Sequence, residues 1–274
     1  MTWNINGVRA RSVELQQLIA REQPDVLCLQ EVKASPEQVP EELRALPGYW
    51  QRWHGHKGYS GVALLLKKAT FPQRPRFSHP EFDMETRVVE ARAGSLAFAS
   101  IYVPNGGKDF DAKLKFLEAL DRYSAGAQAA GLQLTICGDL NVALEERDVH
   151  VSLRKNRDLI GCTPVEREHL RNIMSRGALQ DTHRKFEPDN DQLFTWWAPW
   201  RNQKQKNIGW RIDYVLAAAP IAATAQSCAV QREFGTSDHG PLVAVFDQAV
   251  PPYDAAPEPE PQAAPAPPGQ IPLL

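Results

Sequence analysis

The chain has 274 residues, of which 43% are hydrophobic and 23% are charged, so it is long and apolar enough for one large folded domain. Its formal net charge is −2, and three acidic residues lie in the C-terminal tail, so the remainder is nearly neutral. This balance neither requires nor excludes a polyanionic partner. The sequence has no run of about 20 apolar residues and no signal peptide, which excludes a membrane span and favours a cytoplasmic protein.

The four cysteines have no spacing typical of a zinc site or a disulfide framework. They are Cys28, Cys137, Cys162 and Cys228, and two of them lie within apolar runs. We therefore expect reduced cysteines buried in the core of a cytoplasmic protein.

The first half of the chain combines one helical pattern with several strand patterns. Apolar residues recur at helical spacing after residue 12, and Pro24 ends that pattern. Short apolar runs predict strands at 26–29 and 57–68, and two more within 88–103 that turn at Gly94.

Two helices and two strands are expected in the second half. Asp109 can cap a helix that continues past Leu120, and Leu132 to Cys137 reads as a buried strand that Gly138 ends. Thr163 and Glu166 form a capping-box pattern around Pro164, which opens a helix to about Ser175. Residues 242–246 predict the final strand.

Four apolar strands are each expected to end in reactive side chains. They are Glu31, Asp139 with Asn141, Asp213, and Asp238 with His239. Strand ends at one edge of packed sheets converge, so we expect these groups in a single cleft. Carboxylates with one imidazole and no cysteine favour a hard cation such as Mg²⁺ or Mn²⁺, and the set suits hydrolysis. The alternatives are an Asx-turn at Asp139 and a structural cap at His239.

The pairing expected between Asp213 and His239 has a chemical consequence. A carboxylate beside an imidazole stabilises the imidazolium form, which suits the negative charge that develops when a phosphodiester is cleaved.

Two further segments could contact a phosphate chain. Residues 145–161 form a charged stretch without periodicity, which is either a phosphate contact or a solvated loop. Four tryptophans lie within 194–216, interleaved with Lys204, Lys206 and Arg211. Such aromatics can stack on a sugar or base, or they can belong to the core.

The composition changes at Val250 to proline, alanine and glutamate. We expect a catalytic domain over residues 1–249 and a disordered tail over 250–274, because such a tail buries too little surface to offset the cost of ordering.

Seven motifs taken in order resemble one known family. They are WNINGVRAR, LQEVK, GYSGVALL, YVPNGG, GDLNV, GWRIDY and SDHGP, and they span Thr2 to Phe246. The chain resembles the exonuclease III family of AP endonucleases, within the endonuclease/exonuclease/phosphatase superfamily. The resemblance implies a four-layer α/β sandwich of two packed mixed sheets flanked by helices, as in DNase I. It also implies Mg²⁺-dependent cleavage 5′ to an abasic site, leaving a 3′-hydroxyl, with 3′–5′ exonuclease and 3′-phosphodiesterase activity.

The resemblance assigns roles to the strand-end residues. Glu31 is the implied principal metal ligand, with Asn4, Asp139, Asn141, Asp238 and His239 around the ion. Asp139 would align or deprotonate the attacking water, and Asn141 would position it. Tyr102 would contact the scissile phosphate, and Asp213 would orient His239. The identity of the general base and the number of metals stay open.

The resemblance also implies a DNA-binding surface and a lesion pocket. The phosphate contacts would be Arg9, Lys33, Tyr59, Asn105, Lys108, Asn156 and Arg211. The walls of the pocket for a flipped abasic sugar would be Trp196, Trp210 and Ile212, which gives selectivity because a missing base is easier to flip.

The chain departs from the family pattern at two places. Only Met1 to Trp3 precede Asn4, where relatives complete an edge strand, so the start is either truncated or short. Leu159 replaces a polar group found in some relatives. At the other end, Gln270 to Leu274 resembles the peptide that bacterial proteins insert into the sliding clamp.

Two other functions remain as alternatives. A phosphatase or phosphodiesterase of the same fold, acting on lipid or nucleotide, would share GDxN and SDH but not both tryptophan-containing flanks. An inactive DNA-binding scaffold would not be expected to keep Glu31, Asp139, Asp213 and His239. We expect a monomeric, nucleoid-associated bacterial enzyme acting on double-stranded DNA with abasic sites or blocked 3′ ends.

Overall fold

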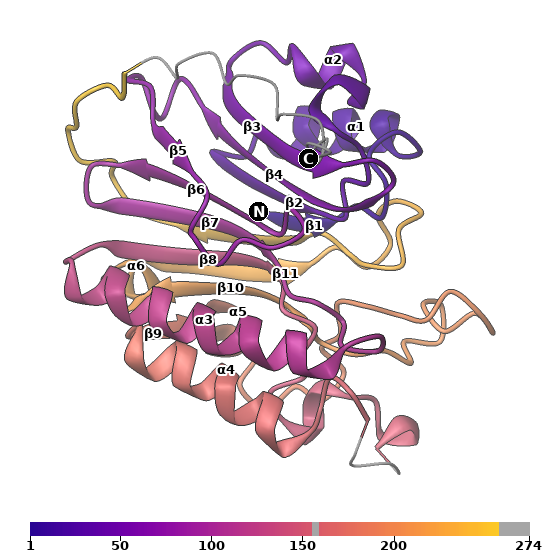
Figure 1. The fold of residues 1–274 in the computed structure, drawn as a ribbon. Coiled ribbons are helices and arrows are strands. Elements are labelled where there is room, and N and C mark those ends of the chain that lie inside the picture. Colours follow the sequence, from indigo (N-terminus) through magenta and orange to yellow (C-terminus); the bar gives the residue numbers. More distant parts are fainter. Residues whose placement is uncertain (155–158, 258–274) are drawn as a thin grey trace, which may run out of the picture.

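The computed structural model describes residues 1–154 and 159–257, which form two packed six-stranded sheets with helices on both outer faces (Figure 1). The first sheet has the order β11 (Ala225–Val230), β12 (Leu242–Phe246), β1 (Thr2–Asn4), β2 (Val26–Gln30), β4 (Tyr59–Lys67) and β3 (Tyr49–His56). The second has the order β5 (Arg76–Ser78), β6 (Val88–Ala93), β7 (Leu96–Tyr102), β8 (Gln133–Asp139), β10 (Asp213–Ala218) and β9 (Leu179–Asp181). The expected sandwich of two mixed sheets is confirmed, since β1 pairs with β2 and β7 with β8 in parallel while their other neighbours are antiparallel.

Helices cover the outer faces of both sheets. The helices of the described residues are α1 (Ser12–Glu22), α2 (Glu41–Arg44), α3 (Phe110–Ala129), α4 (Pro164–Arg176), α5 (Thr182–Phe186) and α6 (Ala219–Ala223), and α6 packs against the core between the sheets. Short 3-10 turns lie at Pro36–Gln38, Glu146–Asp148 and Val151–Leu153. Helix α1 lies over the first sheet, whereas α3 and α4 lie over the second (Figure 1). No helix within the described residues is long and apolar enough to cross a membrane.

Successive side chains of the central strands point to opposite faces of each sheet, and this explains the four layers. In β2, Leu27 and Leu29 face α1, whereas Cys28 faces the second sheet. In β10, Tyr214 faces the cluster beneath α3 and α4, whereas Val215 faces the first sheet. Both faces of these strands are therefore buried, which is why they read as unbroken apolar runs. Complete burial of one such aliphatic side chain contributes about 1.5–3 kcal/mol.

The predicted helix caps and cysteines agree with the structure. The Asp109 side chain accepts a hydrogen bond from the amide of Ala112, and Thr163 and Glu166 form a capping box at the start of α4. All four cysteines are buried free thiols.

Three local predictions were wrong. Gly138 does not end its strand, because β8 continues to Asp139. A Cβ at Gly138 would lie 1.9 Å from the Ile101 carbonyl oxygen, so glycine permits the close approach of β7. Asp213 begins its strand rather than ending it. The strand β1 lies inside the first sheet, between β12 and β2, and not at an edge.

The expected domain boundary at residue 249 also differs from the contacts observed. Val250 and Tyr253 pack against the core between the sheets, and the Tyr253 hydroxyl donates to the Gln73 carbonyl at 2.6 Å. The Ala256 amide donates to the Arg74 carbonyl at 2.8 Å. Residues 250–257 therefore lie against the domain, and residues 258–274 of the predicted tail are outside the described residues.

Candidate active site

The strand-end residues meet in one cleft at an edge of the two sheets. Its cavity of about 320 Å³ is lined by Glu31, Tyr102, Asn105, Asp139, Asn141, Leu159, Ile160, Gly161, Trp196, Trp210, Ile212, Asp238 and His239. Asp139 pairs with Tyr102 on one side and with Asp213 on the other, because β8 lies between β7 and β10. Since β10 runs antiparallel to β8, its first residue lies at the same edge as the last residue of β8.

Positive φ angles turn two of these residues into the cleft. Glu31 and Asn141 both have φ of 50°, and neither is a glycine. A left-handed conformation costs such residues about 1–2 kcal/mol, so the surrounding contacts must hold them there.

The acidic centre joins both sheets. The Asn4 amide nitrogen donates to Glu31 Oε1 at 2.9 Å and to Asp139 Oδ2 at 3.0 Å. Ligand atoms of Glu31, Asp139 and His239 all lie within 4.8 Å of one another. Glu31 and His239 are thus close together although 208 positions separate them in the sequence.

The pKa shifts of the carboxylates in the centre are consistent with the binding of a cation. Burial raises the pKa of Asp139 to about 7; His239 opposes this shift, and Asp213 and Glu31 add to it. Burial acts to raise the pKa of Glu31, but hydrogen bonds from Asn4 and Lys33 outweigh it and hold that pKa below its usual value. Crowded carboxylates with oxygen atoms facing one space form a donor set suited to a hard divalent cation. Glu31 and Asp139 are the residues that would hold it.

Three other predicted metal ligands make protein hydrogen bonds instead. Asn4 directs its nitrogen, which cannot ligate, at the two carboxylates, and its oxygen accepts from the Asn6 amide. Asn141 donates to the Val103 carbonyl and accepts from Asn105. Asp238 accepts from Asn6 and from the Trp196 indole. The hydrogen bonds of Asn4, Asn141 and Asp238 therefore hold neighbouring groups in position.

The predicted pairing of Asp213 with His239 is present. His239 Nδ1 lies 2.8 Å from Asp213 Oδ2, and Nε2 lies 3.8 Å from Asp139 Oδ2. Burial acts to lower the pKa of His239, but the charge of Asp213 and its hydrogen bond raise it to about 10. His239 is therefore an imidazolium at neutral pH. Thr195 Oγ1 accepts from the Asp213 amide at 3.0 Å and fixes the start of β10.

Tyr102 is a neutral hydrogen-bond donor in the cleft. Burial raises the pKa of its phenol far above the ordinary value, and the charges of Glu31 and Asp139 add to the shift. Its hydroxyl thus keeps its proton at neutral pH.

Aromatic side chains form the wall beside the acidic centre. The rings of Trp196 and Trp210 pack edge to face with centroids 6.3 Å apart, and Ile212 is buried next to them. A Cβ at Gly161 would lie 3.0 Å from the Trp210 ring, so the chain opposite passes close to this wall. Trp197 is buried in the core and Trp200 is 59% exposed, so neither lines the cavity.

The predicted phosphate contacts fall into three groups. Lys33 pairs with Glu31 at 2.6 Å, and Asn105 lines the cavity. Arg9, Tyr59 and Lys108 lie on the surface outside it, with the Lys108 ammonium 6.0 Å from the Tyr59 ring centroid. Asn156 is outside the described residues.

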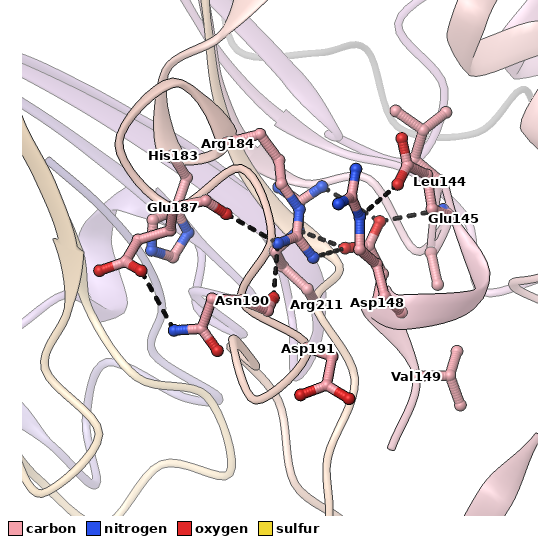
Figure 2. Close-up of polar contacts among 12 residues, drawn as sticks. Leu144, Glu145, Asp148, Val149, His183, Arg184, Glu187, Asn190, Asp191 and Arg211 are labelled. Carbon is pink, nitrogen blue, oxygen red and sulfur yellow. Dashed lines mark hydrogen bonds and ion pairs between the residues drawn. The ribbon is translucent and has the colours of Figure 1, made fainter. Parts of the chain in front are cut away.

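Arg211 was predicted to contact DNA, but its side chain is fully buried in this structure. Figure 2 shows its guanidinium beside Asp148. Its Nε and Nη2 donate to the two Asp148 oxygens at 2.8 and 3.1 Å, and Nη1 donates to Asp181 at 2.7 Å. Arg184 donates to the same Asp148 carboxylate. This network fixes the segment that carries Trp210 and Ile212.

Sequence reasoning missed a buried ion pair behind the cleft. Lys113 Nζ on α3 lies 2.5 Å from Glu166 on α4, and both side chains are fully buried. The same ammonium donates to the Asn141 carbonyl at 2.7 Å and to the Asn105 carbonyl at 3.2 Å. Glu166 in turn accepts from the Gly161 amide at 2.8 Å. The signal in the sequence was a lysine on the apolar face of a helix, at the position between Phe110 and Phe116.

We predict that Lys113→Met lowers kcat about tenfold and also lowers the melting temperature. The substitution removes the donor that holds the Asn141 carbonyl and leaves Glu166 without its cation. Lys115→Met is the matched control, because Lys115 is exposed on the same helix and should change neither quantity. The test is steady-state kinetics well below the melting temperature. A kcat equal to that of the parent in both variants would contradict the prediction.

A two-sheet sandwich with a buried carboxylate centre, an oriented imidazolium and a donor set for a cation defines a hydrolase of the metal-dependent class. More particularly, residues 1–239 match the Endonuclease/Exonuclease/phosphatase family, and the chain belongs to that family. Enzymes of this family depend on a divalent metal, and the predicted resemblance to its AP endonucleases is confirmed.

Known relatives span nearly the whole chain. DNA repair nuclease APEX1 of Danio rerio is 34% identical over 252 residues, which cover 88% of this chain and 79% of that protein. Exodeoxyribonuclease of Bacillus subtilis (strain 168) is 29% identical over 252 residues, covering 90% and 98%. An AP endonuclease from Archaeoglobus fulgidus superposes with a TM-score of 0.79 at 29% identity, covering 90% of this chain and 98% of that chain. The 3′ phosphatase NExo from Neisseria, bound to product DNA hairpin, gives 0.81 at 28% identity with the same coverage.

Proposed function

We propose that the protein is a Mg²⁺-dependent AP endonuclease that hydrolyses the phosphodiester 5′ to an abasic site, with 3′–5′ exonuclease and 3′-end cleaning activity. The observation that carries this proposal is the continuity of one cavity. It joins the Glu31 and Asp139 carboxylates and His239 to the wall formed by Trp196, Trp210 and Ile212. The relatives named as AP endonuclease, exodeoxyribonuclease and 3′ phosphatase support it.

Each residue of the cleft has a separate role in the proposed reaction. Bound Mg²⁺ would polarise the phosphate and neutralise its charge. Asp139, with Oδ1 fixed by the Asn141 amide at 2.9 Å, is placed to orient the attacking water and accept its proton. The His239 imidazolium would face the developing negative charge, and the neutral Tyr102 hydroxyl would donate a hydrogen bond to a phosphate oxygen or to the leaving-group oxygen.

The wall of the cavity explains selectivity for a missing base. A nucleotide must leave the duplex to reach a phosphate in this cleft, and flipping costs least where no base is stacked. We expect the two indole rings and Ile212 to admit a sugar and to exclude a sugar that carries its base. The enzyme can therefore select an abasic site without contacts that distinguish one base from another.

One assay tests the proposal against its alternatives. A labelled duplex with a single tetrahydrofuran abasic analogue is incubated with Mg²⁺ or with EDTA. We expect one incision 5′ to the analogue that requires Mg²⁺, and no incision of the intact duplex. Cleavage of small phosphoesters alone would instead indicate a phosphatase or phosphodiesterase, and tight binding without incision would indicate a scaffold.

The pH dependence of the reaction should follow His239. In Asp213→Asn protein the loss of the adjacent carboxylate should move the imidazole pKa from about 10 towards 6.5, so that incision at pH 8 falls about thirtyfold. A raised pKa contributes stability that is present below about pH 6.5 and lost as the pH rises through 10, so this variant should also melt earlier at pH 8. NMR titration of His239 in metal-free protein measures the shift directly. An unchanged His239 pKa in the Asp213→Asn variant would contradict the prediction. Asp247→Asn is the control variant, because Asp247 is exposed.

Three further expectations belong to this proposal and await experiment. We propose a monomer, a bacterial cytoplasmic enzyme associated with the nucleoid, and a tail that tethers it to the sliding clamp through Gln270 to Leu274. The bacterial exodeoxyribonuclease relative supports the second. A pulldown with purified clamp in which deletion of residues 270–274 changes nothing would remove the third.

A further inference from the structure

A second group of possible metal ligands lies outside the cleft, where β3 meets the segment between β5 and β6. It consists of His54, His79 and Asp83, and one ligand atom from each lies within 4.8 Å of the others. His54 Nε2 lies 2.5 Å from Asp83 Oδ2, and the two imidazole rings stack with centroids 3.8 Å apart. None of the three side chains is fully buried, so an ion could reach them from solvent.

Backbone contacts hold two of the three side chains in ligand orientation. His79 Nδ1 lies 3.0 Å from the Val88 carbonyl oxygen. A carbonyl can only accept, so Nδ1 carries the proton and Nε2 keeps its lone pair. Asp83 Oδ1 accepts from the Arg87 and Val88 amides at 2.8 and 2.9 Å, which leaves Oδ2 for a further partner. Metal-binding histidines are usually oriented in this way, by a hydrogen bond from the second nitrogen to a carbonyl or carboxylate.

We propose that His54, His79 and Asp83 form a second metal site, which takes an ion of the Zn²⁺ or Co²⁺ class. Two imidazoles and one carboxylate are a common donor set for such ions, whereas Mg²⁺ prefers oxygen ligands. Three protein ligands leave the fourth position to water. The site is distinct from the Glu31 centre in residues and in metal preference.

The side chains would have to adjust to bind the ion, because the two rings are stacked. Ligands at about 2.0–2.2 Å from a tetrahedral ion lie about 3.3 Å from each other. The His54 nitrogen and the Asp83 oxygen would therefore separate slightly, and the stacked rings would turn their lone pairs towards one point. The surroundings favour a neutral His79 ring, because burial lowers the pKa of His79, the Val88 hydrogen bond opposes that shift, and neighbouring His54 adds to it.

An ion at this site would brace the rim of the active-site cleft. The segment it would fix leads directly to Arg87, whose guanidinium lies 4.7 Å from the Tyr102 ring centroid and donates to the Tyr59 hydroxyl at 2.9 Å. A bound metal ion would thus link β3 to the loop before Arg87, which contacts Tyr102 and Tyr59. The inference does not depend on the proposed function, because it concerns binding and stability.

The test separates the two sites by mutation. Glu31→Gln protein, stripped with chelator, is dialysed against micromolar Zn²⁺ or Co²⁺ in excess Mg²⁺, and bound metal is measured by elemental analysis and by the Co²⁺ absorption spectrum. We expect one ion per chain, together with a raised melting temperature. Adding His79→Gln should weaken binding at least tenfold, although glutamine can still donate to the Val88 carbonyl. Adding His56→Gln is the matched control, since His56 is exposed on the same strand, and it should leave binding unchanged.

Either of two results would overturn the site. One is the absence of bound Zn²⁺ or Co²⁺ in the Glu31→Gln protein, and the other is equal binding by the His79→Gln and His56→Gln versions. If His79→Gln misfolds by circular dichroism, Asp83→Asn decides the question instead. Asparagine keeps an oxygen for the Arg87 and Val88 amides but offers a nitrogen to the ion, so undiminished binding by that variant would equally refute the proposal.

Discussion

Asp139→Asn is expected to lower kcat for incision at an abasic analogue by about a thousandfold, with little change in KM. The Asp139 carboxylate is the group placed to accept the proton of the attacking water, and general-base catalysis contributes about 10²–10⁴-fold. Asparagine has nearly the same shape but cannot take that proton, and it also removes one charge from the set that would hold Mg²⁺. Single-turnover incision with saturating enzyme measures the chemical step alone.

The same variant should remain folded. Burial beside Asp213 and Glu31 makes the Asp139 carboxylate costly in the folded state, and its raised pKa means that this cost is present above about pH 7 and absent below about pH 4. Asparagine relieves the repulsion but turns a donor towards the Asn4 amide, so the two effects offset one another. We therefore expect a melting temperature within a few degrees of the parent at pH 8.

Asp238→Asn provides the matched control for this prediction. It makes the same chemical change in the same cavity, but Asp238 is bonded to Asn6 and Trp196 and does not belong to the ligand group of Glu31, Asp139 and His239. We expect a loss in kcat of less than tenfold. If Asp238→Asn abolished incision and Asp139→Asn did not, the assignment of the base would be wrong.

The sequence predicted the parts of the fold that depend on local pattern. Apolar runs marked β2, β4, β8 and β12 because both faces of a central strand are buried, and side-chain caps marked α3 and α4. The strand around residues 49–56 has only two buried side chains, at Tyr49 and Trp53, so it carried no apolar run and was missed. The strands β5 and β9 have three residues each, which is too short for any periodicity.

The candidate site was predictable only where the residue type itself carries the chemistry. Carboxylates and a histidine next to strands indicated the centre, and the motifs assigned their partners. Which side-chain atom of Asn4 faces the carboxylates, its nitrogen or its oxygen, depends on contacts between distant segments, and so does the burial of a cation such as Lys113. Arg211 shows the difficulty, since it lies in a recognisable motif among aromatics and cations, yet its partners Asp148 and Asp181 come from a 3-10 turn and from the end of β9.

Replacement of Arg211 by leucine is expected to destabilise the protein by about 3–5 kcal/mol, because removal of one partner leaves the buried Asp148 and Asp181 carboxylates without their cation. For a chain of this size the melting temperature should fall by about 10 °C. Burial acts to raise the pKa of Asp148, but Arg211 and Arg184 outweigh it and lower that pKa. The ion pair therefore contributes stability above about pH 4 that is lost as the pH falls through the lowered pKa, so the difference between Arg211→Leu and the parent should shrink in acid.

A DNA contact at Arg211 would give the opposite pattern. Loss of one phosphate contact leaves the melting temperature unchanged, weakens DNA binding and reduces the salt dependence of binding by about one counterion. Exposed Arg201→Leu, on the loop between Trp200 and Trp210, is the matched control and should not alter stability. Differential scanning calorimetry and salt-dependent DNA binding on both variants distinguish the two roles. Unchanged melting in Arg211→Leu, with weaker and less salt-dependent binding, would show that the guanidinium leaves Asp148 to meet the DNA backbone.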